Sequence, residues 1–333
     1  MSDFDSPEGE RAEILRLLGL HGRNTLSFLL RYDAPWRHFV TSEGAVGWLG
    51  APGAAVGWSD PLCEQAQVPG VLRSFTSAMR SERRAICLIA VGEATALAAL
   101  GLGYSVLKIG EDPWFDLGEW QMARGNRGKS LRRSLNLARR RGVEIETYRP
   151  AERRDLRTEA EIVDVLGRWR QAFPRSVPRS FMRPSPLEEV AEKQIFLARV
   201  AGRAETFLAC SPVYGRSGYY LEDLIRAPEA VNGTSELLVV EALARLKASG
   251  ARCAALGIAP LRGCATQPDP RARWLRPLLA FAIRRFERRY RLAALTHYEE
   301  KFRPTRWEGS FIAFHPALPR LRVVRAAVKF LEA

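Results

Sequence analysis

The sequence predicts an α/β fold, in which helices pack against a sheet of strands. The chain has 333 residues, which is enough for one large domain or two ordinary ones. Residues 71–109 alternate between helical and strand patterns, and residues 219–261 have the order strand, helix, strand. This alternation is typical of helices packed on a sheet, and it argues against an all-helical or an all-β protein.

The elements of the first part of the chain follow from capping residues and apolar spacing. Ser6 and Pro7 begin a predicted helix that ends near Leu20. Residues 21–63 contain short apolar runs separated by glycine turns, which predict short strands. The segments expected next are a helix at 71–81, a strand at 85–91, a helix at 93–100 and a strand at 105–109.

A polar linker at residues 148–155 separates this part from a second α/β unit. We therefore predict a domain boundary near residue 150, with an N-terminal domain at 1–150 and a C-terminal domain at 151–333. The segments expected after the linker are helices at 160–172 and 187–194 and strands at 195–201 and 205–213.

Residues 219–261 are the most informative stretch of the chain. An aromatic and apolar run at 219–225 predicts a strand that carries Asp223 and ends at Arg226. Asn232 and Gly233 predict a turn, after which Thr234 or Ser235 is expected to cap a helix that ends at Gly250. Ligands in open α/β sheets bind at strand ends, so Asp223 and Arg226 are candidate site residues if the chain bends between them. The competing interpretation is a structural ion pair or a solvated loop.

A second short strand is predicted at residues 253–256, where Gly257 and Pro260 end it. Near the C-terminus, a basic helix is expected at 274–290 and an amphipathic basic helix at 318–331. Docking against the protein and contact with a membrane surface are both open for the last helix.

The charge is strongly positive and concentrated in two segments. The formal net charge is +14, from 51 Lys and Arg against 37 Asp and Glu. Residues 124–141 hold eight basic residues and no acid, and residues 271–291 hold eight arginines and one acid, Glu287. Such segments favour an anionic partner, either nucleic acid or an acidic membrane surface.

The basic segment at 129–141 predicts an amphipathic helix. Leu131, Leu135 and Ala138 fall on one face, while Arg132 and Arg133 lie on the other. A solvated helix usually interleaves acids for i,i+4 pairing, and this one has none, so phosphate binding is the better interpretation. The backbone of tRNA and an anionic lipid are both open as partners.

Several other chemistries fit the sequence poorly. Gly128, Lys129 and Ser130 suggest a phosphate-binding loop, but Ala123 stands where that motif needs glycine. The four histidines show no metal-binding spacing, and the sequence lacks the glycine patterns of dinucleotide-binding proteins and of hydrolase elbows. The five cysteines show no CxxC spacing, which favours reduced core residues. No metal or cofactor is expected.

The sequence from residue 223, DLIRAPEAVNGTSELLVVEAL followed by LGIAPL, resembles the signature of the aminoacyl-phosphatidylglycerol synthases, the catalytic part of the multiple peptide resistance factor family. Four more blocks occur in the family's order. WSDPL at 58–62 resembles GDPVG without its glycines, KIGED at 108–112 resembles KIGEE, and GK at 128–129 precedes an arginine-rich helix. YEEKFRPTRW at 298–307 resembles FKxKFxPxW, but Glu299 replaces a lysine and Trp307 lies one residue late.

The resemblance implies a tandem acetyltransferase-like (dual GNAT) fold, with mixed sheets flanked by helices. It also implies transfer of an amino acid, with lysine or alanine expected, from its tRNA to the hydroxyl of phosphatidylglycerol. Asp223 would orient the donor's ammonium group or assist deprotonation, Arg226 would hold a phosphate, and Lys301 would neutralise an oxyanion or a phosphate. The expected substrate-binding residues are Lys108, Glu111, Lys129, Arg132, Arg133, Tyr220, Gly257 and Trp307. The alternative for Lys108 and Glu111 is a surface hairpin that turns at Gly110.

The expected partners are an aminoacyl-tRNA and an anionic phospholipid at the membrane surface, and not DNA. The sequence shows neither a signal peptide nor a good transmembrane helix, which predicts a cytoplasmic protein, peripheral on the inner membrane face. Two alternatives stay open on the same fold. One is transfer to another lipid or a soluble acceptor, and the other is acyl-CoA-dependent N-acylation or simple tRNA or lipid binding.

Overall fold

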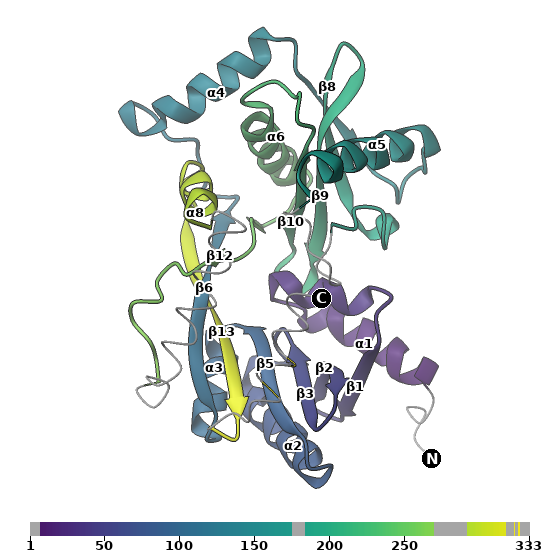
Figure 1. Cartoon of the computed structure of the whole chain (residues 1–333), viewed down its shortest axis with the longest axis vertical. Coiled ribbons are helices and arrows are strands. Elements are labelled where there is room, and N and C mark those ends of the chain that lie inside the picture. The colour runs from purple at the N-terminus through teal and green to yellow at the C-terminus, as the bar shows by residue number, and fades with distance from the viewer. Residues whose placement is uncertain (1–6, 175–183, 270–291, 318–322, 324–325, 327–333) are drawn as a thin grey trace.

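The computed structural model describes residues 7–174, 184–269 and 292–317, together with Val323 and Ala326. Strands run through the middle of the molecule and helices lie around them (Figure 1). The α-helices are α1 (Pro7–His21), α2 (Val68–Ser81), α3 (Glu93–Gly101), α4 (Lys129–Arg140), α5 (Leu156–Ala172), α6 (Thr234–Ala248) and α8 (Leu292–Glu300). The 3-10 helices are η1 (Thr25–Arg31), η2 (Gln65–Gln67), η3 (Asn126–Gly128), η5 (Val190–Glu192) and η6 (Tyr214–Arg216).

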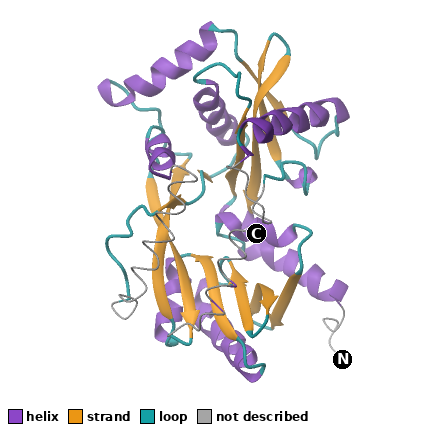
Figure 2. Cartoon of the chain, in the orientation of Figure 1, coloured by secondary structure: helices purple, strands orange, loops and turns teal. Residues whose placement is uncertain are grey.

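The described strands form one mixed sheet, seen in orange in Figure 2. They are β1 (Trp36–Thr41), β2 (Gly44–Ala51), β3 (Ala54–Trp58), β4 (Leu62–Cys63), β5 (Ala85–Val91), β6 (Ser105–Asp116), β7 (Glu144–Tyr148), β8 (Gln194–Val200), β9 (Arg203–Val213), β10 (Gly218–Arg226), β11 (Cys253–Ala255), β12 (Ala259–Pro260) and β13 (Arg306–His315). Their order is β1-β2-β3-β5-β13-β6-β11-β10-β9-β8-β7, with β12 paired to β6 and β4 to β2. The α/β class and the mixed sheet flanked by helices are therefore confirmed.

Two connections in this order position the candidate site. The late strand β13 inserts between β5 and β6 and is antiparallel to both. The unit β10-α6-β11 has the predicted order, and its two strands are parallel neighbours. Together these connections bring β6 and β10 to the middle of the sheet on either side of β11, and α8 contacts β12, which pairs with β6.

Helix α6 begins differently from the prediction. Its N-cap is Gly233 at φ +90°, and neither Thr234 nor Ser235 supplies a side-chain cap. Thr234 instead donates its hydroxyl hydrogen bond to the carbonyl of Val231, 2.7 Å away. Glycine suits the cap because a left-handed φ is costly for other residues, and because a Cβ there would lie 2.2 Å from the carbonyl oxygen of Ser134.

Helices cover the sheet with amphipathic faces. Leu131, Leu135 and Ala138 of α4 are buried, as their spacing predicts, in a core that also contains Leu238 and Leu243 of α6. A separate core joins α2 and α3 to the strands of the other half of the sheet. Each fully buried leucine side chain contributes about 1.5–3 kcal/mol to the free energy of folding.

Two local expectations are wrong, and one open alternative is excluded. Residues 25–31 form the 3-10 helix η1 and not a strand, because Asn24 accepts a hydrogen bond from the amide of Leu26 and starts a helical turn. The helix expected at 187–194 is reduced to η5, since Glu189 adopts a left-handed φ of +51° and Lys193 is extended. Gly110 is not a hairpin turn either. It lies inside β6, where a Cβ would be 2.5 Å from the carbonyl oxygen of Ala259 in β12.

The domain boundary near residue 150 stays a prediction. The sheet is continuous across the chain, β7 pairs with β8, and β13 pairs with β5 and β6. Strands from either side of residue 150 thus contribute to both halves of the sheet. The basic helices expected at 274–290 and 318–331 lie outside the described residues, apart from Val323 and Ala326.

Candidate functional site

A bulge in β10 places two consecutive acids in the interior. Leu221 pairs with Cys210 and Asp223 pairs with Ala209, so Glu222 is an extra residue with no partner in the β9 register. Bulges of this kind re-aim side chains and often lie beside functional sites. Asp223 is only 8% exposed.

The carboxylate of Glu222 is surrounded by donors. The hydroxyl of Tyr32 donates to its Oε1 at 2.6 Å, the Nζ of Lys193 lies 3.2 Å from its Oε2, and the hydroxyl of Ser211 also donates to Oε2. Lys193 is 2% exposed, and its ammonium also donates to the Tyr32 hydroxyl at 2.6 Å and to the carbonyl of Ser185 at 2.9 Å. This buried ion pair therefore has its hydrogen bonds satisfied, as burial requires.

Asp223 has a different environment, although it is the next residue. Its Oδ2 accepts a hydrogen bond from the amide of Ser185 at 3.0 Å. Burial and then the charge of Glu222 raise the pKa of Asp223 to about 8, against the opposing effects of Lys193 and the Ser185 amide. Burial therefore favours the protonated form of Asp223 and brings its proton exchange closer to neutral pH than in an ordinary aspartate.

Two further buried carboxyl groups lie nearby, and each has an oxygen without a hydrogen-bond partner. They are Oδ1 of Asp112, on β6, and Oε2 of Glu299, on α8. Burial raises the pKa of Asp112 to about 7, with Glu308 adding to the effect. Burial, and then the charge of Asp112, raises the pKa of Glu299 to about 8.

Tyr220 links these groups. Burial of its hydroxyl raises its pKa, and the charges of Glu222, Asp223, Asp112 and Glu299 raise it further, in that order. Four carboxyl groups from β6, β10 and α8 thus lie within electrostatic reach of one hydroxyl. We call Asp112, Glu222, Asp223 and Glu299 the carboxyl cluster.

Gly257 makes room for the Tyr220 ring. It follows β11 with φ +90°, and a Cβ there would lie 2.8 Å from Cε2 of Tyr220 and 3.0 Å from its hydroxyl oxygen. The structure therefore brings together Tyr220, Gly257 and Asp223, three of the residues predicted from the sequence.

Lys108, Glu111 and Trp307 form a neighbouring group around Arg262. The Nζ of Lys108 lies 2.6 Å from Oε1 of Glu111, and the Nε of Arg262 lies 3.1 Å from its Oε2. The guanidinium of Arg262 stacks 3.8 Å from the ring centre of Trp307. Arg262 also opposes the rise in the pKa of Glu299, so this group borders the carboxyl cluster.

Arg226 and Lys301 lie on another side of β10. Asp223 and Arg226 are three residues apart in a regular stretch, so their side chains leave opposite faces of the strand and do not meet. Arg226 contacts Asn232 at 3.4 Å, and Lys301 lies 3.4 Å from Glu236 in the first turn of α6. Both cations therefore lie near the N-terminus of α6.

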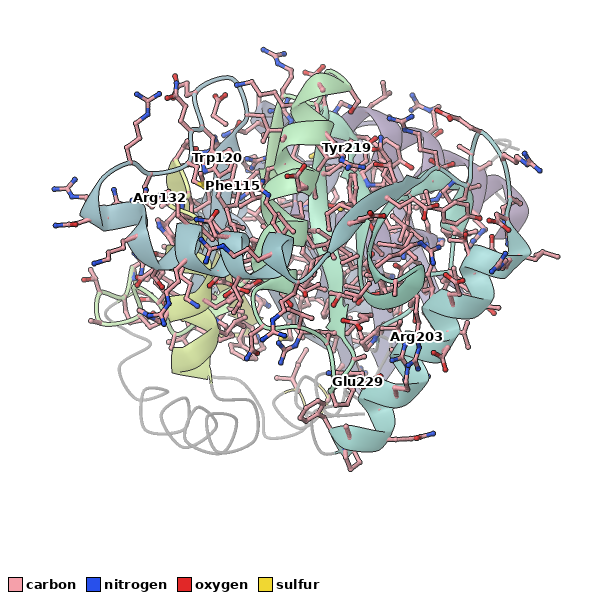
Figure 3. The ribbon with its side chains drawn as sticks, turned by 90° about the horizontal axis from the view of Figure 1, so that it is seen from above. Phe115, Trp120, Arg132, Arg203, Tyr219 and Glu229 are labelled. Atoms are coloured by element: carbon pink, nitrogen blue, oxygen red, sulfur yellow. The ribbon has the colours of Figure 1, made fainter. Side chains whose placement is uncertain are left out.

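The cations of α4 are separate from these groups. Lys129 and Arg133 are exposed. Arg132 instead donates to the carbonyls of Ala123, at 2.6 Å, and Gly125, so it braces the preceding loop. In Figure 3 Arg132 lies on α4, on the same side of the molecule as Trp120 and Phe115.

Sequence reasoning missed several residues of the site. Lys193 and Tyr32 lie far from Glu222 in the chain, so no local signal marks them. Glu299 was interpreted as a replaced substrate-binding lysine, but the structure buries it to 2% exposure beside Asp112. Glu308 was detectable as the residue after Trp307. It lies opposite Asp112 in the sheet and forms a two-pronged ion pair with Arg216.

In the part of the chain that the structure describes, no three His, Cys, Asp or Glu side chains are grouped so that they could hold a metal ion. The five cysteines are free, and four of them are buried. In the same described residues, no helix combines the length and apolar character needed to cross a bilayer.

The fold places the chain beside solved structures of the same mixed α/β architecture. It aligns with the C-terminal domain of a putative lysylphosphatidylglycerol synthetase from Agrobacterium fabrum, at a TM-score of 0.77, 16% identity, and coverage of 98% of this chain and 96% of that one. It also aligns with the L-PGS of Bacillus licheniformis at a TM-score of 0.78 and 18% identity, over 98% of both chains. At these identities the likeness concerns the fold.

The sequence identifies the family. The pattern of the family described as "Phosphatidylglycerol lysyltransferase, C-terminal" matches residues 16–314, so the chain belongs to that transferase family. It is 24% identical over 331 residues to the "Lysylphosphatidylglycerol biosynthesis bifunctional protein LysX" of Mycobacterium avium, covering 95% of this chain and 27% of that protein. The protein of the same name from Rhodococcus jostii is 25% identical over 307 residues, covering 89% of this chain and 26% of that protein. The chain thus spans about a quarter of the length of these relatives.

Proposed function

We propose that the protein transfers an amino acid, lysine in the first instance, from its tRNA to a hydroxyl group of phosphatidylglycerol. The observation that carries the proposal is the carboxyl cluster around Tyr220, with one unpaired buried oxygen on Asp112 and another on Glu299. Buried carboxyl oxygens without partners are costly, and an ammonium group from a ligand would satisfy them. Family membership supports the same reaction.

In the proposed donor complex, Asp112 and Glu299 bind the ammonium groups of the aminoacyl ester. Since Glu222 is paired with Lys193 and Asp223 acts as the base, these two acids match the two ammonium groups of a lysyl donor and exceed what the single ammonium group of an alanyl donor needs. Binding a cation lowers the pKa of both acids, because an opposite charge favours the ionised form.

Asp223 is the proposed general base. Its ionised carboxylate takes the proton of the lipid hydroxyl, whose oxygen attacks the ester carbonyl carbon. The bond between that carbon and the ribose oxygen then breaks, and the ribose oxygen takes the proton from Asp223. Proton transfer by a positioned group of this kind contributes typically 10²–10⁴-fold to a rate.

Arg226 and Lys301 are proposed to bind phosphate groups of the substrates near the N-terminus of α6, where the helix dipole also favours anions. Lys108 and Glu111 neutralise each other, so we assign them to the support of Arg262 and Trp307. The exposed cations of α4 are proposed to contact the tRNA backbone. Because the proposed acceptor is an anionic lipid, the protein is also proposed to contact the inner membrane face.

The test is transfer of radiolabel to lipid. Purified protein is incubated with lysyl-tRNA or alanyl-tRNA and vesicles containing phosphatidylglycerol, with and without RNase, and the lipid fraction is counted. The proposal expects RNase-sensitive labelling, stronger with the lysyl donor, and a rate that rises with pH toward 8 as Asp223 ionises. Absence of lipid labelling with either donor contradicts the phospholipid acceptor, and stronger labelling from alanyl-tRNA contradicts the choice of lysine.

A further inference from the structure

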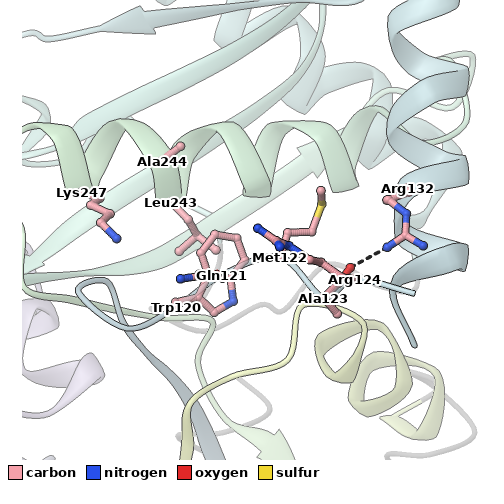
Figure 4. Close-up of a pocket in the computed structure, with 9 residues that line it drawn as sticks. All are labelled: Trp120, Gln121, Met122, Ala123, Arg124, Arg132, Leu243, Ala244 and Lys247. Carbon is pink, nitrogen blue, oxygen red and sulfur yellow. Dashed lines mark hydrogen bonds between the residues drawn. The ribbon is translucent and has the colours of Figure 1, made fainter. Parts of the chain in front are cut away.

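A pocket of about 430 Å³ lies between the loop after β6, helix α4 and helix α6 (Figure 4). It lies apart from Asp223, Arg226 and Lys301, none of which lines it. Its lining residues are Trp120, Gln121, Met122, Ala123, Arg124, Arg132, Leu243, Ala244 and Lys247. Volumes of this size hold small ligands or single building blocks of larger ones.

The pocket combines an apolar floor with cations. Trp120, Met122 and Leu243 supply apolar surface, while Arg124 and Lys247 supply positive charge at exposed positions. None of the described residues that line the pocket is an acid. Its chemistry therefore fits a ligand with one flat or apolar part and one anionic part.

The walls of the pocket are held in place without a ligand. The Nε1 of Trp120 donates to the carbonyl of Phe302 at 2.8 Å, and its ring meets Phe115 edge to face at 5.8 Å. The hydrogen bonds of Arg132 fix the opposite wall through Ala123. Gly128 packs so closely that a Cβ would lie 1.9 Å from the carbonyl oxygen of Ala123. A preformed pocket binds at a lower entropic cost than one that must be ordered.

We infer that this pocket binds one unpaired nucleotide of the RNA donor, with its base against Trp120 and its phosphate beside Arg124 and Lys247. The inference rests on the proposed function and deepens it. Sites for single-stranded nucleic acid combine an aromatic surface for stacking with cations along the backbone, and both are present here. The side-chain amide of Gln121 adds a donor and an acceptor suited to the edge of a base.

The position of the pocket supports this assignment. Phe302, which accepts the Trp120 hydrogen bond, is the residue next to Lys301. Helix α6 runs from Glu236, the partner of Lys301, to Lys247 in the pocket, a rise of about 16 Å along the axis. An RNA strand whose aminoacylated end lies in the carboxyl cluster would therefore pass α6 and place an earlier nucleotide in the pocket.

The test compares two RNA hairpins with the same duplex, one blunt and one carrying a short single-stranded 3′ extension, by fluorescence anisotropy. The wild-type protein is expected to bind the extended hairpin roughly tenfold more tightly, the size of effect that stacking one base gives. Arg124→Ala with Lys247→Ala should remove this preference. The matched control, Arg157→Ala with Arg203→Ala, changes two cations whose side chains are 90% and 63% exposed away from the pocket, and should keep it.

Two further variants test the role of the aromatic ring. Trp120→Leu should lose the preference and Trp120→Phe should keep most of it, with thermal melts confirming that both variants fold. The inference is overturned if the Arg124→Ala, Lys247→Ala variant keeps the wild-type preference for the extended hairpin. It is also overturned if that variant keeps this preference but binds phosphatidylglycerol vesicles more weakly than the wild type. If the wild-type protein binds both hairpins equally, the inference alone fails. If it binds neither and labels no lipid, the proposed function fails as well.

Discussion

The carboxyl cluster and helix α4 carry opposite charges, and the structure treats those charges in opposite ways. The acids of the cluster are buried, and their charges are either paired, as in Glu222 with Lys193, or suppressed by raised pKa values, as in Asp112, Asp223 and Glu299. On α4, Lys129, Arg133 and Arg140 are exposed to solvent. Ligand recognition by the cluster depends on the positions and protonation states of its acids, whereas recognition by α4 depends on its density of positive charge.

This difference separates two kinds of recognition. A buried group has few ways to satisfy its hydrogen bonds, so the cluster is expected to select one chemical group in one orientation. Exposed cations attract any polyanion, and salt screens them. Substitutions in the two regions should therefore differ in size and in what they change.

The largest expected effect is on transfer activity. Asp223→Asn keeps an oxygen for the Ser185 amide but cannot accept a proton, so the initial rate of lipid labelling should fall by about 10²–10⁴-fold. Asp33→Asn, at an exposed position, is the control and should keep the wild-type rate. A rate within threefold of wild type in Asp223→Asn would remove Asp223 from the mechanism.

The next effect is on stability. Lys193→Met leaves the buried carboxylate of Glu222 without its cation, which should lower the free energy of unfolding by about 3–5 kcal/mol in urea titrations. The double variant Lys193→Met with Glu222→Gln removes both charges and should recover part of the loss. If the single variant is as stable as wild type, the buried pair does not hold β10 against the chain between η5 and β8.

The raised pKa of Asp112 makes stability depend on pH. Its pKa is about 7 in the folded chain and about 4 when unfolded, so between these values the folded state binds the proton more strongly and stability falls as pH rises. Asp112→Asn should flatten this decline by up to about 1.4 kcal/mol per pH unit between pH 4 and 7. The measurement is urea unfolding at several pH values, and identical slopes for both proteins would contradict the raised pKa.

A pair of glycine substitutions isolates the contact with Tyr220. Gly257 and Gly142 both have a left-handed φ, but a Cβ meets the Tyr220 ring at Gly257 and open space at Gly142. Gly257→Ala should cost about 1–3 kcal/mol more stability than Gly142→Ala and should slow transfer by moving Tyr220. Equal effects on melting temperature and rate would mean that the Tyr220 ring adapts freely.

The smallest effect on folding is expected on α4. Arg133→Ala should change stability by less than about 0.5 kcal/mol, since the side chain is exposed. It should nevertheless lower the slope of log affinity for tRNA against log salt by about 1 if the side chain contacts a phosphate. An unchanged slope would exclude Arg133 from the tRNA contact.

The same contrast explains how much could be predicted from the sequence. Helix α4 was predicted with its buried face, and α2, β5 and α3 near their observed bounds, because spacing along the chain carries that information. The carboxyl cluster depends on contacts between segments far apart, such as Tyr32 with Glu222 and Asp112 with Glu299. The bulge at Glu222 and the burial of Lys193 arise from tertiary packing, which periodicity does not report.

The place of β13 also has a consequence for how the chain folds during synthesis. Residues 306–315 lie between β5 and β6, which precede them by about 200 residues in the sequence. Until the ribosome has released residues 306–315, one edge of β5 and one edge of β6 have no partner strand. Such unpaired edges promote incorrect strand pairing. We therefore expect the N-terminal strands to mature only after translation has passed residue 315. A slow folding phase should report this closure, because contacts so distant in sequence form late.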